Sequence, residues 1–244
     1  MAVPAKMVGF KEADPSIVKR LLVAVESLEK EGKTHFALTA PSPIAVFDFD
    51  TGMEGVVGKF TKTKKIYVSD YRRLGDAMTN KVENWAIMWE KFKREYIAAL
   101  EEPTIQTVVM DTATEVWELL RMARFGKLTQ VMPYQYGPVN AEYRELLRKA
   151  YSGNKNLILL HKMKDEYVKD QRTGNLKRSG FGDTGYMVQV NLRMWRDEDN
   201  HFHMFVKDCR QNPDVAGLDL MDDAATFPML ANCIFPETTE KEWV

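Results

Sequence analysis

The sequence of 244 residues contains little cysteine and almost no net charge. Its only two cysteines, Cys209 and Cys233, lack C-x-x-C spacing and are too few for a disulfide framework, so we expect ordinary thiols in a reducing compartment. The net charge of −1 excludes a global positive field, so any contact with nucleic acid requires a local basic patch.

Long hydrophobic runs are also absent. No run approaches the roughly 18 uninterrupted apolar residues that a membrane-spanning helix needs. We therefore expect no membrane association and a cytoplasmic location. With 45% hydrophobic residues, the length suits one sizeable α/β domain with its own core.

Short apolar runs bounded by turn signals alternate with segments of helical periodicity. This order predicts a mainly parallel central sheet flanked by helices, with antiparallel strands at one edge. The expected strands are residues 21–25, 44–49, 107–110 and 157–160, followed by a hairpin-like pair, 186–193 and 202–207. The expected helices are residues 80–100, 114–125 and 140–151. An aromatic stripe along the first helix indicates a core face, with a stacking platform for bases as the alternative.

Residues 27–34 read Ser-Leu-Glu-Lys-Glu-Gly-Lys-Thr between an expected strand and a helix that starts at residue 35. A P-loop has the pattern G-x-x-x-x-G-K-[ST] in this context, because its backbone N–H groups cradle phosphate oxygens. Ser27 replaces the first glycine, and Glu29 and Glu31 would repel a triphosphate unless they point outward or Lys30 offsets them. The alternative is a helix N-terminus with Gly and Thr near its cap. The candidate nucleotide-binding residues are Ser27, Glu31, Gly32, Lys33, Thr34 and His35.

Acidic residues at two further strand ends favour the nucleotide site. Asp48 and Asp50 lie at the end of strand 44–49, and Asp111 follows strand 107–110. In open α/β sheets, ligands bind beyond the carboxyl ends of the strands. Asp111 and Thr34 are therefore the candidate ligands of a Mg²⁺ ion bound with ATP.

Gly32-Lys33-Thr34 and residues 45–55, 108–112 and 157–161 together resemble the RecA-like core ATPases. The similarity is closest to the small phage ATPases that include the single-strand-annealing recombinase group. It covers about residues 21–210 and implies a RecA-like P-loop NTPase domain over residues 21–236. Residues 1–20 then form an N-terminal extension, and residues 237–244 an acidic C-terminal tail, which we expect to be disordered.

The resemblance also assigns catalytic roles. An acidic residue at the tip of the strand after the P-loop helix activates the attacking water in this family, and Asp50 stands at that place, with Asp48 as the fallback. His161 occupies the position of a γ-phosphate sensor, although a strand-end histidine is also typical of a surface or capping residue. The implied catalytic residues are Lys33, Asp50, Asp111 and His161.

A second DNA-binding loop is expected after His161, because RecA-like proteins place one there. Residues 162–178 contain six cations against three acids, which suits contact with a phosphate backbone. Tyr167 or Phe181 is a candidate for stacking on bases. A solvated β-hairpin tip is the alternative. The candidate DNA-binding cations are Lys162, Lys164, Lys169, Arg172, Lys177 and Arg178.

Lys207 and Arg210 resemble the cations that reach a neighbouring subunit's phosphates in this family. They imply a homo-oligomer, as a ring or a filament, and the alternative is an exposed strand end. His201 and His203 share one face of a strand, but no third ligand stands at a recognisable metal-binding spacing.

These features predict an ATP-binding and ATP-hydrolysing protein that acts on single-stranded DNA in phage recombination or replication, in the host cytoplasm if the source is viral. A nucleotide-dependent assembly or binding module with little turnover is the alternative. A small-molecule P-loop kinase is a third reading, which would need a substrate lid.

Overall fold

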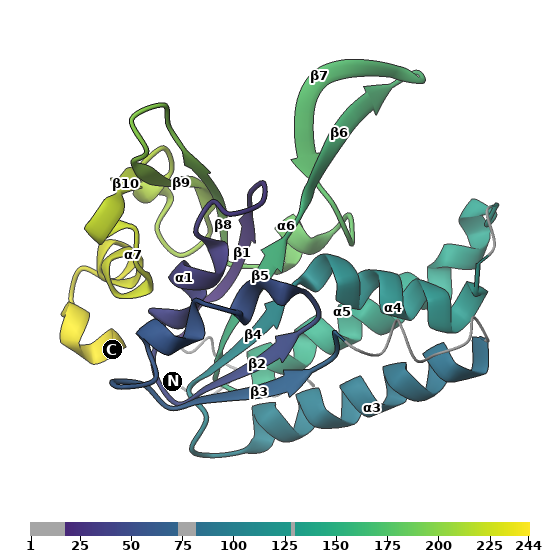
Figure 1. The fold of residues 1–244 in the computed structure, drawn as a ribbon, viewed down its shortest axis with the longest axis horizontal. Helices are drawn as coiled ribbons and strands as arrows, with labels where there is room; N and C mark the ends of the chain where they lie inside the picture. Colours follow the sequence, from purple (N-terminus) through teal and green to yellow (C-terminus); the bar gives the residue numbers. More distant parts are fainter. Residues whose placement is uncertain (1–17, 73–81, 128–129) are drawn as a thin grey trace, which may run out of the picture.

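The computed structural model describes residues 18–72, 82–127 and 130–244. They form one eight-stranded sheet, in the order β10-β9-β8-β1-β5-β4-β2-β3, with helices on both faces (Figure 1). The parallel strands are β1 (Leu22–Glu26), β2 (Ile44–Asp48), β3 (Ile66–Asp70), β4 (Thr107–Asp111), β5 (Asn156–His161) and β8 (Val190–Arg196). Strands β9 (Phe202–Cys209) and β10 (Asp219–Met221) are antiparallel at one edge. The predicted fold class is confirmed.

Two hydrophobic cores lie on opposite faces of the sheet, and successive residues of each central strand alternate between them. In β1, Val23 and Val25 point into one core while Leu22 and Ala24 point into the other. All five β1 residues are buried, as expected for a strand covered on both faces. Helices α1 (Lys33–Leu38) and α7 (Phe227–Ile234) cover the first face, and α3 (Val82–Glu101), α4 (Ala113–Phe125) and α5 (Tyr136–Ser152) cover the second.

Short 3-10 turns and one short helix connect these elements. The 3-10 turns are Thr51–Met53, Val57–Lys59, Pro133–Gln135, Pro213–Val215, Asp222–Ala224 and Glu240–Trp243, and the short helix is α6 (Thr184–Met187). Within the described residues, no helix is both long and apolar enough to cross a membrane.

The segment after β5 forms a separate antiparallel hairpin of β6 (Met163–Val168) and β7 (Gln171–Arg178). In Figure 1 it projects away from the sheet and the helical layers. Most of its side chains are exposed or half-buried on both faces. The segment expected as a loop is therefore a solvated β-hairpin, the conformation that the alternative interpretation predicted.

Three details of the sequence-based prediction are wrong. The strand expected from residue 186 begins at Val190, because residues 184–187 form helix α6, with a hydrogen bond from Val188 N–H to Thr184 O. Strand β3 was not expected, since it is an edge strand whose side chains are only partly buried. Phe181, a candidate for base stacking, is buried against Trp117 and Tyr143.

The acidic tail is ordered, which corrects the expectation of disorder. Trp243 is buried and stacks on Phe235 with ring centroids 5.5 Å apart, and its Nε1 donates to Thr238 Oγ1. Burial of this aromatic side chain outweighs the solvation of the acidic residues around it. Glu242 adds an exposed ion pair with Lys19.

The aromatic stripe of α3 forms core, as predicted. Trp89, Phe92 and Tyr96 are fully buried, and Phe92 packs edge-on against Phe47 with ring centroids 5.2 Å apart. These rings are therefore unavailable as a stacking platform for bases.

Candidate functional site

The predicted P-loop joins β1 to α1 as a tight turn around one ammonium group. Gly32 has φ +87°, in the left-handed region that favours glycine, and Lys30 also lies in that region at φ +63°. Lys33 Nζ donates to Ser27 Oγ at 2.8 Å, Ser27 O at 3.3 Å and Leu28 O at 2.6 Å. Ser27 replaces the first glycine of the pattern. It accepts hydrogen bonds from the Lys33 ammonium through both its hydroxyl oxygen and its backbone carbonyl. Burial lowers the pKa of Lys33.

A hydrogen bond joins the first turn of α1 to the end of β4. Thr34 Oγ1 donates to Asp111 Oδ2 at 2.8 Å. Gly52 packs closely against this pair. A Cβ atom at Gly52 would lie 2.9 Å from both Asp111 Oδ2 and Thr34 Oγ1. The two predicted Mg²⁺ ligands are therefore adjacent, and the space beside them is kept free of a side chain.

The donor set fits a magnesium ion bound together with phosphates. In the described part of the chain, no group of three or more His, Cys, Asp or Glu side chains is arranged to hold a metal ion. A hydroxyl and one carboxylate are nonetheless sufficient for Mg²⁺, because it completes its coordination with phosphate oxygens and water. Burial raises the pKa of Asp111, and the hydrogen bond from Thr34 opposes this effect.

A second buried carboxylate lies beside Asp111. Asp48 ends β2 opposite Asp111 in the sheet register, and its side chain is 1% exposed. Burial and the neighbouring Asp111 raise its pKa to about 7, although Arg72 Nε, 3.4 Å from Asp48 Oδ2, favours the charged form. Two carboxylates so close in a buried place favour protonation of one of them.

Asp50, the candidate water-activating residue, is half-exposed at the rim of the same site. Its Oδ1 accepts from Thr51 N–H at 2.8 Å, and its Oδ2 lies 3.2 Å from Lys162 Nζ. Partial burial disfavours its charged form, but the Thr51 hydrogen bond and Lys162 together hold its pKa below the ordinary value. The structure thus presents Asp50 as an ionised carboxylate.

The two acidic residues of the loop differ in their surroundings. Glu31 Oε2 accepts from the Leu28 N–H at 2.8 Å, so this carboxylate engages one of the loop's own amides, while Glu29 is exposed. His35 is exposed and its ring stands edge-on to Phe60, with centroids 4.9 Å apart. Burial lowers the pKa of His35, with Lys59 adding to the effect.

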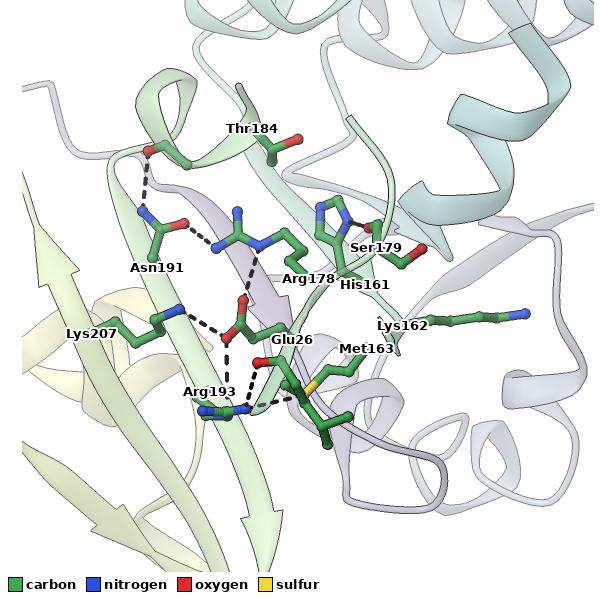
Figure 2. Close-up of polar contacts among 12 residues, drawn as sticks. Glu26, His161, Lys162, Met163, Arg178, Ser179, Thr184, Asn191, Arg193 and Lys207 are labelled. Atoms are coloured by element: carbon green, nitrogen blue, oxygen red, sulfur yellow. Dashed lines mark hydrogen bonds and ion pairs between the residues drawn. The ribbon is translucent and has the colours of Figure 1, made fainter. Parts of the chain in front are cut away.

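His161 is fully buried at the end of β5. Its Nδ1 lies 3.0 Å from Ser179 O, which makes Nδ1 the protonated nitrogen, and Nε2 has no hydrogen-bond partner among the described residues. Burial lowers its pKa to about 3, and Arg178 adds to this effect. His161 is therefore a neutral imidazole that links β5 to the segment following the hairpin (Figure 2).

Two predicted cations, Arg178 and Lys207, contact Glu26, a residue that sequence reasoning missed. Arg178 Nε donates to Glu26 Oε2 at 3.1 Å, and Lys207 Nζ donates to Glu26 Oε1 at 2.8 Å (Figure 2). Arg210 lies elsewhere, with Nη2 donating to Tyr186 O at 2.5 Å. The sequence signal was an acid at the end of a fully apolar strand, directly before the P-loop.

The remaining candidates lie apart from the P-loop. Lys164, Lys169, Arg172 and Lys177 are exposed on the β6–β7 hairpin, as is Tyr167. His201 pairs with Asp222, and His203 lies between Asp219 and Asp197 near the β9–β10 edge.

The raised pKa of Asp48 predicts a pH-dependent stability. A folded pKa of about 7, above the ordinary 3.8, stabilises the fold at pH values below about 4, and this contribution is lost as the pH rises through 7. Between pH 4 and 8 without metal, the unfolding free energy of the wild type should fall relative to that of Asp48→Asn. Denaturant unfolding measures this difference, and Asp199→Asn, at an exposed turn, should follow the wild type. Parallel curves for wild type and Asp48→Asn would contradict the assignment.

The chain is similar to a solved structure and to a protein family. The crystal structure of the RadB recombinase is similar to the chain with 13% sequence identity and a TM-score of 0.47, covering 82% of this chain and 86% of that one. No curated protein matches the chain. Residues 21–187, more than half of the sequence, match the family model described as AAA domain. The chain with this P-loop and this Thr34–Asp111 pair therefore belongs to the AAA domain family.

Proposed function

We propose that this protein binds ATP with Mg²⁺ at the Ser27–Thr34 loop and hydrolyses it. The observation that carries the proposal is the Thr34–Asp111 hydrogen bond of 2.8 Å, with Gly52 against both side chains. The AAA domain match supports the same nucleotide-binding ATPase class.

Each residue of the site has a separate task in this proposal. The loop amides and the Lys33 ammonium hold the phosphates, and Thr34 and Asp111 supply oxygen ligands. When bound, Mg²⁺ neutralises charge that develops on the phosphate oxygens. Asp50, kept ionised by Thr51 N–H and Lys162, orients the attacking water and accepts its proton.

Two observations favour the alternative of a binding module with little turnover. The Asp50 carboxylate already has an ion pair with Lys162, which competes with a water for its oxygens. Glu31 also occupies the Leu28 N–H, an amide that a P-loop would offer to phosphate. Both contacts must rearrange for efficient hydrolysis, so slow turnover with measurable binding would follow if they persist.

Single-stranded DNA is the proposed macromolecular partner, with the β6–β7 hairpin as its contact surface. The hairpin projects from the body and carries exposed cations together with Tyr167, a residue that is 56% exposed. Cations track a phosphate backbone, and an exposed aromatic ring stacks on bases. Two further parts of the proposal rest on the sequence resemblance. They are a role in phage recombination or replication, and assembly into a ring or filament in which Lys207 and Arg210 reach a neighbouring subunit's phosphates.

Replacement of Lys33 tests whether ATP binding and hydrolysis occur at the Ser27–Thr34 loop. Lys33→Ala is expected to abolish ATP binding and hydrolysis, whereas Lys62→Ala, at an exposed turn before β3, should leave both unchanged. Asp50→Asn should bind ATP but lose turnover by about 10²-fold or more, as is typical for loss of a general base. Phosphate release and equilibrium ATP binding, each measured with and without single-stranded DNA, test this. Wild-type binding without any turnover would favour the binding module instead.

The salt dependence of DNA binding should identify the hairpin. Each phosphate contact contributes a slope of about −0.7 to log K against log salt for single strands, so Lys169→Gln with Lys177→Gln should reduce the slope by about 1.4. The matched pair Arg148→Gln with Lys149→Gln, on the exposed side of α5, should leave the slope unchanged. Fluorescence anisotropy with a labelled oligonucleotide measures both, and absence of binding at low salt would exclude the DNA partner.

A further inference from the structure

Glu26 is a buried carboxylate that joins the P-loop strand to three cations. It is the last residue of β1, one peptide bond before Ser27, and its side chain is 3% exposed. Arg178 Nε and Lys207 Nζ donate to it at 3.1 and 2.8 Å, and Arg193 Nε lies 4.0 Å from Oε1 (Figure 2). A buried carboxylate is stable only when such partners compensate it.

The cations around Glu26 come from three strands: Arg178 from β7, Arg193 from β8 and Lys207 from β9. Arg178 ends β7 and also donates through Nη2 to Asn191 Oδ1 at 2.6 Å. Arg193, on β8, donates to Leu176 O of the hairpin at 3.4 Å. The returning strand of the hairpin is thus attached to the P-loop strand through Glu26 and its neighbours.

The outgoing strand of the hairpin is attached to the opposite side of the same site. Lys162, directly before β6, places Nζ 3.2 Å from Asp50 Oδ2 and 2.7 Å from Glu115 Oε1. Ser179, directly after Arg178, accepts from His161 Nδ1. Both strands of an otherwise projecting arm therefore end on residues that flank the P-loop.

The position of Glu26 makes it responsive to what the loop binds. Ser27 accepts Lys33 through Oγ and its carbonyl, and bound phosphates would compete for this ammonium. Any adjustment of Ser27 moves the adjacent Glu26 backbone. Because the Glu26 carboxylate is buried, it must keep cationic partners, so a small shift at the loop changes which of these cations it holds.

We infer that Glu26 is a positioning residue that transmits the nucleotide state of the P-loop to the β6–β7 hairpin through Arg178. This inference rests on the proposed nucleotide binding and adds to it the residue that couples the two sites. Coupling is reciprocal, so a ligand on the hairpin also changes nucleotide affinity through the same contact.

Hydrogen exchange of the hairpin amides, with and without Mg·ATP, tests the inference on the full chain. In the wild type, saturating Mg·ATP should change exchange at residues 163–178 by at least about fivefold, the lower end of typical coupling between sites. Glu26→Gln keeps the size and one acceptor oxygen of the side chain but removes the charge. It should still bind Mg·ATP and should lose the exchange response of the hairpin.

Glu142→Gln is the matched control. Glu142 also accepts from cations on other elements, Lys93 Nζ at 3.0 Å and Arg124 Nη2 at 2.7 Å, but it lies in the helical layer. This variant should keep the wild-type response. If Glu26→Gln does not fold, Arg178→Gln removes the other end of the same contact and is judged by the same measurement.

The outcomes separate the inference from the proposed function. A wild type that binds no ATP overturns the proposed function. A wild type that binds ATP without any hairpin response, or a Glu26→Gln protein that binds ATP with the full response, overturns the role of Glu26 alone.

Discussion

The hydrogen bond from Thr34 to Asp111 is the contact on which the site depends. It joins residues that are 77 positions apart in the sequence. Thr34 follows the loop after β1, Asp111 ends β4, and strand β5 lies between β1 and β4 in the sheet. Asp111 is buried and therefore needs a partner, and the Thr34 hydroxyl supplies one from the first turn of α1. Gly52 completes the arrangement, because any side chain there would meet both oxygens.

Acidic side chains lie at three places around this contact. Asp48 and Asp111 are buried together, so burial raises both of their pKa values. Asp50 lies outside that pair, and the hydrogen bond from Thr51 N–H together with Lys162 holds its pKa below the ordinary value. Glu26 lies on the other side of the loop, where it holds the hairpin through Arg178. In the proposed function, Asp111 supplies a metal ligand, Asp50 orients the attacking water, and Glu26 couples the loop to the hairpin.

The sequence predicted the parts that local pattern determines. Gly32-Lys33-Thr34 is a contiguous motif, and Asp111 follows an apolar run, so their meeting could be inferred from parallel strand order. Glu26 ends an apolar strand, but its partners Arg178 and Lys207 could not be inferred because they are 152 and 181 residues away. The β6–β7 hairpin lacks the alternation of buried and exposed residues that marks a strand with one buried face. The acidic C-terminal segment, expected to be disordered, is ordered because the ring of Trp243 is buried.

The most direct test of the Mg²⁺ and nucleotide site is the affinity of Gly52→Ala for ATP, measured calorimetrically with Mg²⁺ and with EDTA. The added methyl would lie 2.9 Å from both Thr34 Oγ1 and Asp111 Oδ2, whereas a methyl at Gly58 would meet nothing within 4 Å. We expect Gly52→Ala to weaken Mg·ATP binding by at least about tenfold, or roughly 1.4 kcal/mol. Gly58→Ala should bind as the wild type does, and the difference between the two variants should vanish in EDTA. Wild-type Mg·ATP affinity in Gly52→Ala would contradict a magnesium site at Thr34 and Asp111.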